Sequence, residues 1–311
     1  MNRRHTTPIS RTKKLPAYRS FRLSKPIKAH EVKPLPSSRR LWKDTWLFLW
    51  QHRVKILIFL AIYTFTYISL IKSGSGFDMD YDVVKEELRN ALTGNIGAII
   101  SFISLYATLV SSVTQSAGDV ANYTQTTILV LFSLAYIWLI RRLHGKKLAT
   151  IKDAFYRGST PLIPFLGVLV LLVLEVVPAG LGALLLVTAQ NTDAIGRGAQ
   201  TFAFGLLALL CGILSIYLLA GSILALYIVT LPGTGPIVAV RSSLRLLRIH
   251  RWRVLLRIVS FVLLLLVSGF FVALPFIIWL PRYAEIAMYI MSCLSFGVFH
   301  VYMFKLYRSL L

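Results

Sequence analysis

A single acidic side chain, Glu175, lies near the centre of a long apolar run of the sequence. A carboxyl group at bilayer depth is costly, so the default expectation for such a residue is a role in proton or substrate transport. Pro178 follows three residues later, and a proline inside a helix leaves a backbone carbonyl without its partner. Glu175 is therefore the candidate intramembrane polar site. A hydrogen bond to a Ser or Tyr hydroxyl of the helix bundle is the purely structural alternative.

Basic side chains recur at helical spacing in the segment 236–257, directly after the turn sequence TLPGTGP. Proline and glycine in that turn cannot continue the preceding helix. Four arginines are candidates for contact with lipid headgroups: Arg241, Arg245, Arg248 and Arg251. We expect Val240, Leu244 and Leu247 to face inward while the arginines face anionic lipid. The alternative is a solvated basic face that only orients the chain in the membrane.

Other residues with chemical potential fit no complete motif. Asp78, Asp80 and Asp82 alternate as calcium ligands can, but Val83 and Arg89 stand where an EF-hand loop needs glycine and glutamate. The P-loop, HExxH and GxSxG patterns do not occur in the sequence. We expect no catalytic residues, no metal site and no cofactor, so the protein is predicted not to be an enzyme.

The composition is that of a membrane protein. Of the 311 residues, 56% are hydrophobic and 15% are charged, and the mean hydropathy is +0.69, which is too apolar for an ordinary soluble domain. The formal net charge is +22. The Lys and Arg residues lie mainly beside apolar runs and in the amino-terminal tail, as the positive-inside rule requires, which favours a membrane over nucleic acid as the partner.

Six apolar runs are each long enough to cross roughly 30 Å of hydrocarbon at about 1.5 Å per residue. They cover about 54–71, 124–141, 162–189, 201–231, 254–280 and 285–304. We predict an all-α, polytopic transmembrane helix bundle in residues 38–311, after a disordered basic cytoplasmic tail in residues 1–37. Six spans place both termini on the cytoplasmic side.

Residues 95–115 leave the number of spans open. They are apolar, but Ser and Thr side chains form a polar stripe at helical spacing. Arg141 and Arg142 belong on the cytoplasmic side, which requires an even number of crossings before them. We therefore predict an outward-facing helical segment over 82–118, with a re-entrant helix or a seventh span as the alternative.

Two further segments flank the spans. Three tryptophans share one helical face ahead of the first span and predict an interfacial helix: Trp42, Trp46 and Trp50. A second basic segment, residues 146–160, loosely resembles the segment 236–257, and we call both segments basic elbows. Within it, Thr150 and Asp153 have the spacing of a helix-capping pair.

The turn TLPGTGP, the A-x-R-S-S-x-R pattern from Ala239 to Arg245 and the Trp252-led start of the next span occur together. In these features the chain from about residue 140 onward resembles bacterial multi-helix membrane families, including the membrane domain attached to some glycerophosphodiester phosphodiesterases. The resemblance implies a bacterial inner-membrane protein. A phosphodiesterase domain does not accompany it, and no catalytic residues are carried over.

These observations predict an integral membrane protein of non-catalytic role, a scaffold or assembly partner whose basic cytoplasmic face binds anionic membrane lipids. Its partners would be those lipids and another membrane protein or a second copy of the chain. The alternative is a transporter or lipid-handling protein that uses Glu175.

Overall fold

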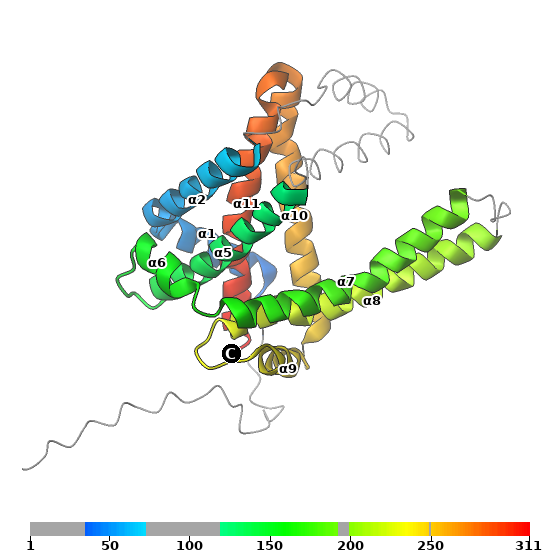
Figure 1. Ribbon diagram of the computed structural model, residues 1–311, viewed down its shortest axis with the longest axis horizontal. Coiled ribbons are helices and arrows are strands. Elements are labelled where there is room, and N and C mark those ends of the chain that lie inside the picture. Colours follow the sequence, from blue (N-terminus) through cyan, green and yellow to red (C-terminus); the bar gives the residue numbers. More distant parts are fainter. Residues whose placement is uncertain (1–34, 73–118, 192–198, 249) are drawn as a thin grey trace, which may run out of the picture. The chain divides into compact units, whose positions relative to one another are not determined.

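The computed structural model describes residues 35–72, 119–191, 199–248 and 250–311, and within these ranges the chain forms helices and turns without a strand (Figure 1). The predicted all-α class is confirmed. The tail up to residue 34, the three alternating aspartates and the segment 82–118 lie outside the described residues. The outward-facing helix and its alternative, a re-entrant helix or a seventh span, therefore stay predictions.

The described helices follow one another with short connections. In chain order they are α1 (Ser38–Gln51), α2 (Arg53–Tyr67), the π-helical turn η2 (Ile68–Lys72), α5 (Asp119–His144), α6 (Ile151–Gly158), α7 (Leu162–Asn191), α8 (Ala199–Val229), α9 (Pro236–Leu247), α10 (Arg251–Trp279) and α11 (Pro281–Ser309). Among the described residues, six helices are long and apolar enough to cross a membrane: α2 with η2, α5, α7, α8, α10 and α11. They indicate a multi-pass membrane protein, and they coincide with the six predicted runs apart from small differences at the ends.

Each basic elbow contains a short helix whose start follows from local sequence. In α6, the Thr150 hydroxyl accepts a hydrogen bond from the backbone N–H of Asp153 at 3.1 Å, as the capping pattern predicts. Pro236 opens α9, where its missing N–H costs no helical bond. Gly233 turns the chain ahead of it with a φ of 77°. The order of one short helix and two long ones thus occurs twice, in α6–α7–α8 and in α9–α10–α11.

Tryptophans of α1 do not all face the same surroundings. Trp46 and Trp50 are 57% and 62% exposed, as side chains at a membrane interface can be. The ring of Trp42 instead packs on Phe261 of α10, with 5.6 Å between centroids. The buried face of α1 consists of Leu41, Thr45 and Phe48.

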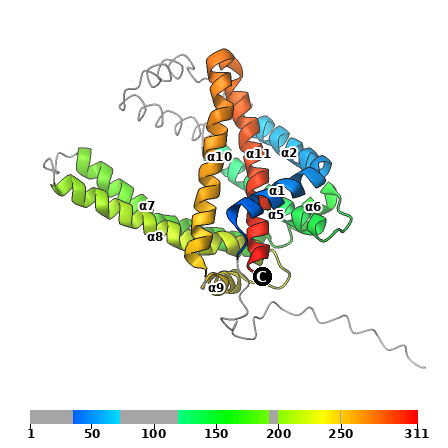
Figure 2. The ribbon, with the colours of Figure 1, turned by 180° about the vertical axis from the view of Figure 1, so that it is seen from behind.

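The most enclosed of the long helices is α5. In its apolar stretch 61% of the residues are buried, against 6% in α8. Aromatic rings surround it: Phe59 of α2 lies 5.0 Å from the ring of Tyr136 and 5.7 Å from that of Phe132. Helices α7 and α8 run side by side, as do α10 and α11 (Figures 1 and 2). The exposed faces of these hairpins are apolar, which suits contact with lipid.

Arg141 joins the end of α5 to the end of α8. Its guanidinium donates to the carbonyl oxygens of Thr230 at 2.9 Å and Tyr227 at 3.1 Å, and to the Thr230 hydroxyl at 2.6 Å. The last carbonyls of a helix have no partner within the helix and carry partial negative charge. A cation donating to them stabilises the carboxyl end of α8 and fixes it against the buried helix.

The contact between α5 and α6 supplies a test of the fold. A Cβ at Gly158 would lie 2.8 Å from the Ala135 Cα of α5, whereas one at Gly205 would meet nothing within 4 Å. We expect Gly158→Ala to lower the free energy of unfolding by about 1–3 kcal/mol through overpacking. Gly205→Ala should leave it unchanged or raise it by up to about 1 kcal/mol, since alanine is the better helix former. Thermal unfolding in detergent, followed by tryptophan fluorescence, compares them; equal midpoints would contradict the packing described.

Candidate functional site

The outer face of α9 carries most of the predicted lipid-contacting arginines. Arg241, Arg245 and the helix-ending Arg248 are exposed. The buried face consists of Ala239, Ser243, Leu246 and Leu247. Leu247 thus faces inward as predicted. Leu244 is 40% exposed but also packs against α8, since a Cβ at Gly221 would lie 2.9 Å from its Cδ2. Ser243 lies on the buried face as well, where it donates a hydrogen bond to the Gly221 carbonyl of α8 at 2.8 Å.

Arg251 differs from the other three arginines. Its guanidinium lies over the ring of Tyr217 in α8, 3.6 Å from the centroid, and donates to the Tyr217 carbonyl oxygen at 3.0 Å. The cation–π contact and the hydrogen bond tie the start of α10 to α8. The structure therefore brings Arg241, Arg245 and Arg248 together on an exposed surface and places Arg251 against a neighbouring helix.

Glu175 is bound within the α7–α8 hairpin. The Ser222 hydroxyl of α8 donates to its Oε1 at 2.7 Å, and Oε2 is buried without a hydrogen-bond partner among the described residues. One turn further along α7, the backbone N–H of Ala179, next to Pro178, donates to the Ser215 hydroxyl at 3.0 Å. These are interhelical bonds of the kind that join spans at bilayer depth. The structural alternative for Glu175, a hydrogen bond to a serine, is observed.

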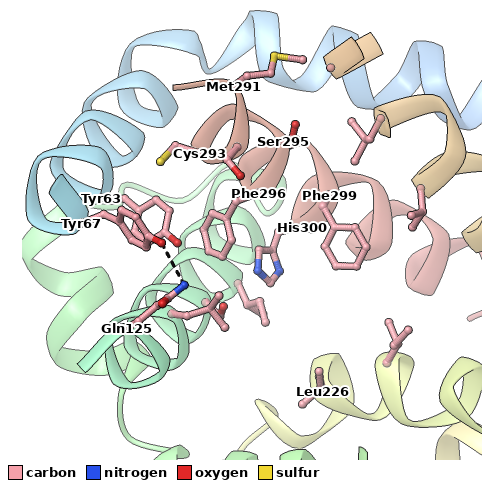
Figure 3. Close-up of a pocket in the computed structure, with 18 of the residues that line it drawn as sticks. Tyr63, Tyr67, Gln125, Leu226, Met291, Cys293, Ser295, Phe296, Phe299 and His300 are labelled. Atoms are coloured by element: carbon pink, nitrogen blue, oxygen red, sulfur yellow. Dashed lines mark hydrogen bonds between the residues drawn. The ribbon is translucent and has the colours of Figure 1, made fainter. Parts of the chain in front are cut away.

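A cavity of about 580 Å³ lies among α2, α5, α7, α8, α10 and α11. Most of its walls are aliphatic or aromatic. Figure 3 shows Tyr63, Tyr67 and Gln125 at one end, His300 and the phenylalanines of α11 in the middle, and Leu226 of α8 on the far side. This volume is within the range of small-molecule sites in proteins. Glu175 is not among the residues that line it.

Polar groups are few in the cavity, and none of the described side chains that line it is Asp, Glu, Lys or Arg. The Gln125 amide donates to the Tyr67 hydroxyl at 3.0 Å, and the Tyr227 hydroxyl is hydrogen-bonded to His300 Nδ1 at 2.9 Å. Phe296 bridges the two ends, since its ring lies 4.7 Å from that of Tyr63 and 4.5 Å from that of His300. The cavity is thus an apolar chamber with neutral hydrogen-bonding groups along one side.

Sequence reasoning did not identify this cavity, although part of the signal is present. Tyr63 and Tyr67 are one helical turn apart, so they share a face of the first span. In α11, Ser292, Ser295 and Phe299 recur at the same spacing, next to His300. Each pattern marks a polar or aromatic stripe on one apolar helix. That the stripes face one another depends on the packing of distant helices, which spacing alone does not reveal.

The described residues hold no group of three or more His, Cys, Asp or Glu side chains that could bind a metal ion. A scan of protein-family models, a search of curated proteins and a search of solved structures each return no match to this chain. The resemblance of its second half to membrane domains of glycerophosphodiester phosphodiesterases stays a prediction.

His52 occupies a basic corner between α1 and α2. Its ring packs edge-on against Phe48, 4.8 Å between centroids, and Lys305 of α11 lies 4.9 Å from the same phenylalanine. Burial, together with the charges of Lys55 and Lys305, lowers the pKa of His52 below its ordinary value of 6.5. Below that pH the unfolded chain takes up a proton at His52 more readily than the folded protein does, so acid weakens folding there.

We therefore expect His52→Gln to reduce the acid sensitivity of the fold. The thermal midpoint of the parent should fall between about pH 7.5 and pH 5.5, the range in which a free histidine titrates. The variant should lose less over the same range, because one group that resists protonation has been removed. Differential scanning fluorimetry across the pH series measures both; identical pH profiles would show that His52 contributes nothing to acid unfolding.

The Glu175–Ser222 bond yields a second expectation. Ser222→Ala removes the only donor that Oε1 has among the described residues and should cost about 1–3 kcal/mol of stability. Glu175→Gln keeps an acceptor for Ser222 and should cost less. In the double variant Glu175→Leu with Ser222→Ala, both polar partners are gone and part of the loss should return. Thermal unfolding of the parent, Glu175→Leu, Ser222→Ala and the double variant forms the cycle, and additive losses would contradict a direct bond.

Proposed function

We propose that this membrane protein handles lipid: it takes a lipid-soluble molecule from the bilayer into the cavity among its helices. The observation that carries the proposal is the cavity itself, about 580 Å³ of mostly apolar space with a few neutral polar groups. Ligand sites in proteins combine apolar walls with a small number of placed polar groups in this way. The sequence suggested a lipid-handling role as an alternative, but through Glu175, which the proposal does not need.

Access from the bilayer supports the proposal. Leu129, Val262 and Leu266 line the cavity and are 39–43% exposed. Exposed apolar side chains in the lining suit contact with lipid. A lipid-soluble molecule can therefore enter laterally between helices without crossing the aqueous phase.

The basic surface of α9 supports contact with anionic lipid at the membrane surface. Arg241, Arg245 and Arg248 stand beside the exposed apolar residues Ile237 and Val238. A helix with arginines and aliphatic side chains on its outer face suits the boundary between headgroups and acyl chains. By the positive-inside rule this face is cytoplasmic, in a bacterial inner membrane if the resemblance of the second half holds.

The scaffold and transport hypotheses have less support. The exposed apolar faces of α7 and α8 suit lipid and a protein partner equally. Glu175 has a structural hydrogen bond and lies outside the cavity lining. A non-catalytic assembly role and a transport role through Glu175 both stay predictions.

Filling the cavity tests the proposal. Leu226→Trp adds an indole to the cavity wall of α8, while Leu214→Trp makes the same change on an exposed face of that helix, where the leucine is 49% exposed. We expect the Leu226 variant to retain at least about tenfold less of the co-purifying lipid-soluble molecule, since an overfilled site costs about 1–3 kcal/mol. Native mass spectrometry in mild detergent measures retention. Equal retention by parent, variant and control would overturn the proposal.

A further inference from the structure

A second, smaller cavity adjoins the first. It has a volume of about 390 Å³ and lies between α8 and α10, and all the described side chains that line it are aliphatic. Ile223, Val262 and Leu266 line both cavities. These three residues therefore form the boundary across which one extended molecule could occupy both spaces. The two cavities differ in kind, since in the part of the chain that the structure describes only the larger has polar side chains in its wall.

The polar groups of the larger cavity include some that the protein leaves without a partner. Among the described residues, no hydrogen bond is made by the Tyr63 hydroxyl, the Ser133 hydroxyl or His300 Nε2. All three side chains line the cavity. Tyr63 and Ser133 come from adjacent helices: the ring of Tyr63 packs 5.0 Å from that of Phe132, the neighbour of Ser133 in α5. Polar groups at bilayer depth are costly when unsatisfied, so these groups need an occupant that can donate or accept hydrogen bonds.

The charge of that occupant is restricted as strongly as its polarity. Among the described residues, the lining holds no Lys or Arg to pair with a phosphate or carboxylate, and no Asp or Glu to pair with an amine. Bringing an unpaired ion into such surroundings costs several kcal/mol, whereas a neutral hydroxyl or carbonyl needs only the hydrogen bonds that Tyr63, Ser133 and His300 offer. The arginines that could bind a phosphate lie instead on the exposed surface of α9.

We propose that the ligand is an uncharged lipid with an oxygen-bearing head and a hydrocarbon chain. The head lies in the larger cavity, hydrogen-bonded to Tyr63, Ser133 and His300. The hydrocarbon chain of the lipid passes the boundary at Ile223 and lies in the smaller cavity between α8 and α10, which we call the aliphatic groove. This inference rests on the proposed function and adds to it the chemical class of the ligand and its direction in the site.

The test compares two photoreactive probes that share one chain. The first is hexadecanol with a diazirine in the chain, and the second is its sulfate ester, which is permanently charged. Each is added to the full-length protein in phosphatidylcholine nanodiscs, irradiated, and located by peptide mass spectrometry. We expect the alcohol to label the groove-facing peptides of α8 and α10, and the sulfate to label them at least about tenfold less, given the cost of an unpaired buried charge.

Variants assign the head and the chain separately. Tyr63→Phe with Ser133→Ala removes two hydroxyls and little volume, and should weaken competition by unlabelled hexadecanol about fivefold for each hydrogen bond lost. Ser260→Ala, which removes an exposed hydroxyl that bonds only within α10, is the matched control. Ile223→Trp should block the boundary and abolish labelling of the groove, while Leu214→Trp should not. Size-exclusion profiles identify any variant that fails to fold.

The outcomes separate the two proposals. The neutral-lipid assignment would be overturned if the alcohol and the sulfate labelled the protein equally. It would also be overturned if neither the hydroxyl variants nor Ile223→Trp changed the labelling. Either result would leave a lipid-binding cavity. Labelling of the cavity and groove no stronger than that of the exposed face of α7, with lipid retention unaffected by Leu226→Trp, would overturn the proposed function as well.

Discussion

Polar groups at bilayer depth have to find partners inside the protein, and much of this structure follows from how they do so. The Glu175 carboxyl accepts a hydrogen bond from the Ser222 hydroxyl, and the backbone N–H beside Pro178 donates to the Ser215 hydroxyl. The Arg141 guanidinium donates to the last carbonyls of α8. Each of these bonds joins two helices rather than two residues of one helix. The hairpin of α7 and α8 and its attachment to α5 are thus fixed at the few positions where an apolar sequence contains something polar.

Apolar packing also holds the helices together, and it is concentrated around α5. The rings of Phe59, Phe132, Phe155 and Tyr136 pack together at centroid distances of 4.9 to 5.7 Å. Between spans in lipid, shape and contact hold helices together more than exclusion of water does. This explains why α6 approaches α5 at a glycine, Gly158, where any side chain would meet the backbone of Ala135.

The sequence was sufficient for the helices and insufficient for the cavity, for physical reasons that particular residues illustrate. Long apolar runs and flanking charges are local properties, so the six spans and the capped start of α6 at Thr150 could be predicted. The part that Ser243 plays in the inward face of α9 could not be predicted, because it depends on a bond to the carbonyl of a glycine in another helix. Tyr63, Ser133 and His300 come from three helices widely separated along the chain, and no local pattern indicates that they share a wall.

Helix α8 connects these features. It receives Arg141 at its carboxyl end, bonds Glu175 through Ser222, and supports α9 through Gly221. Through Ile223 and Leu226 it also forms part of the wall of the larger cavity. The contacts with α5, α7 and α9 are directional, so α8 has little freedom to rotate about its axis. The smaller cavity between α8 and α10 can persist under that constraint. On that side the polar contact described is the one from Arg251, at the start of α10, to Tyr217, and the described side chains that line the cavity are aliphatic.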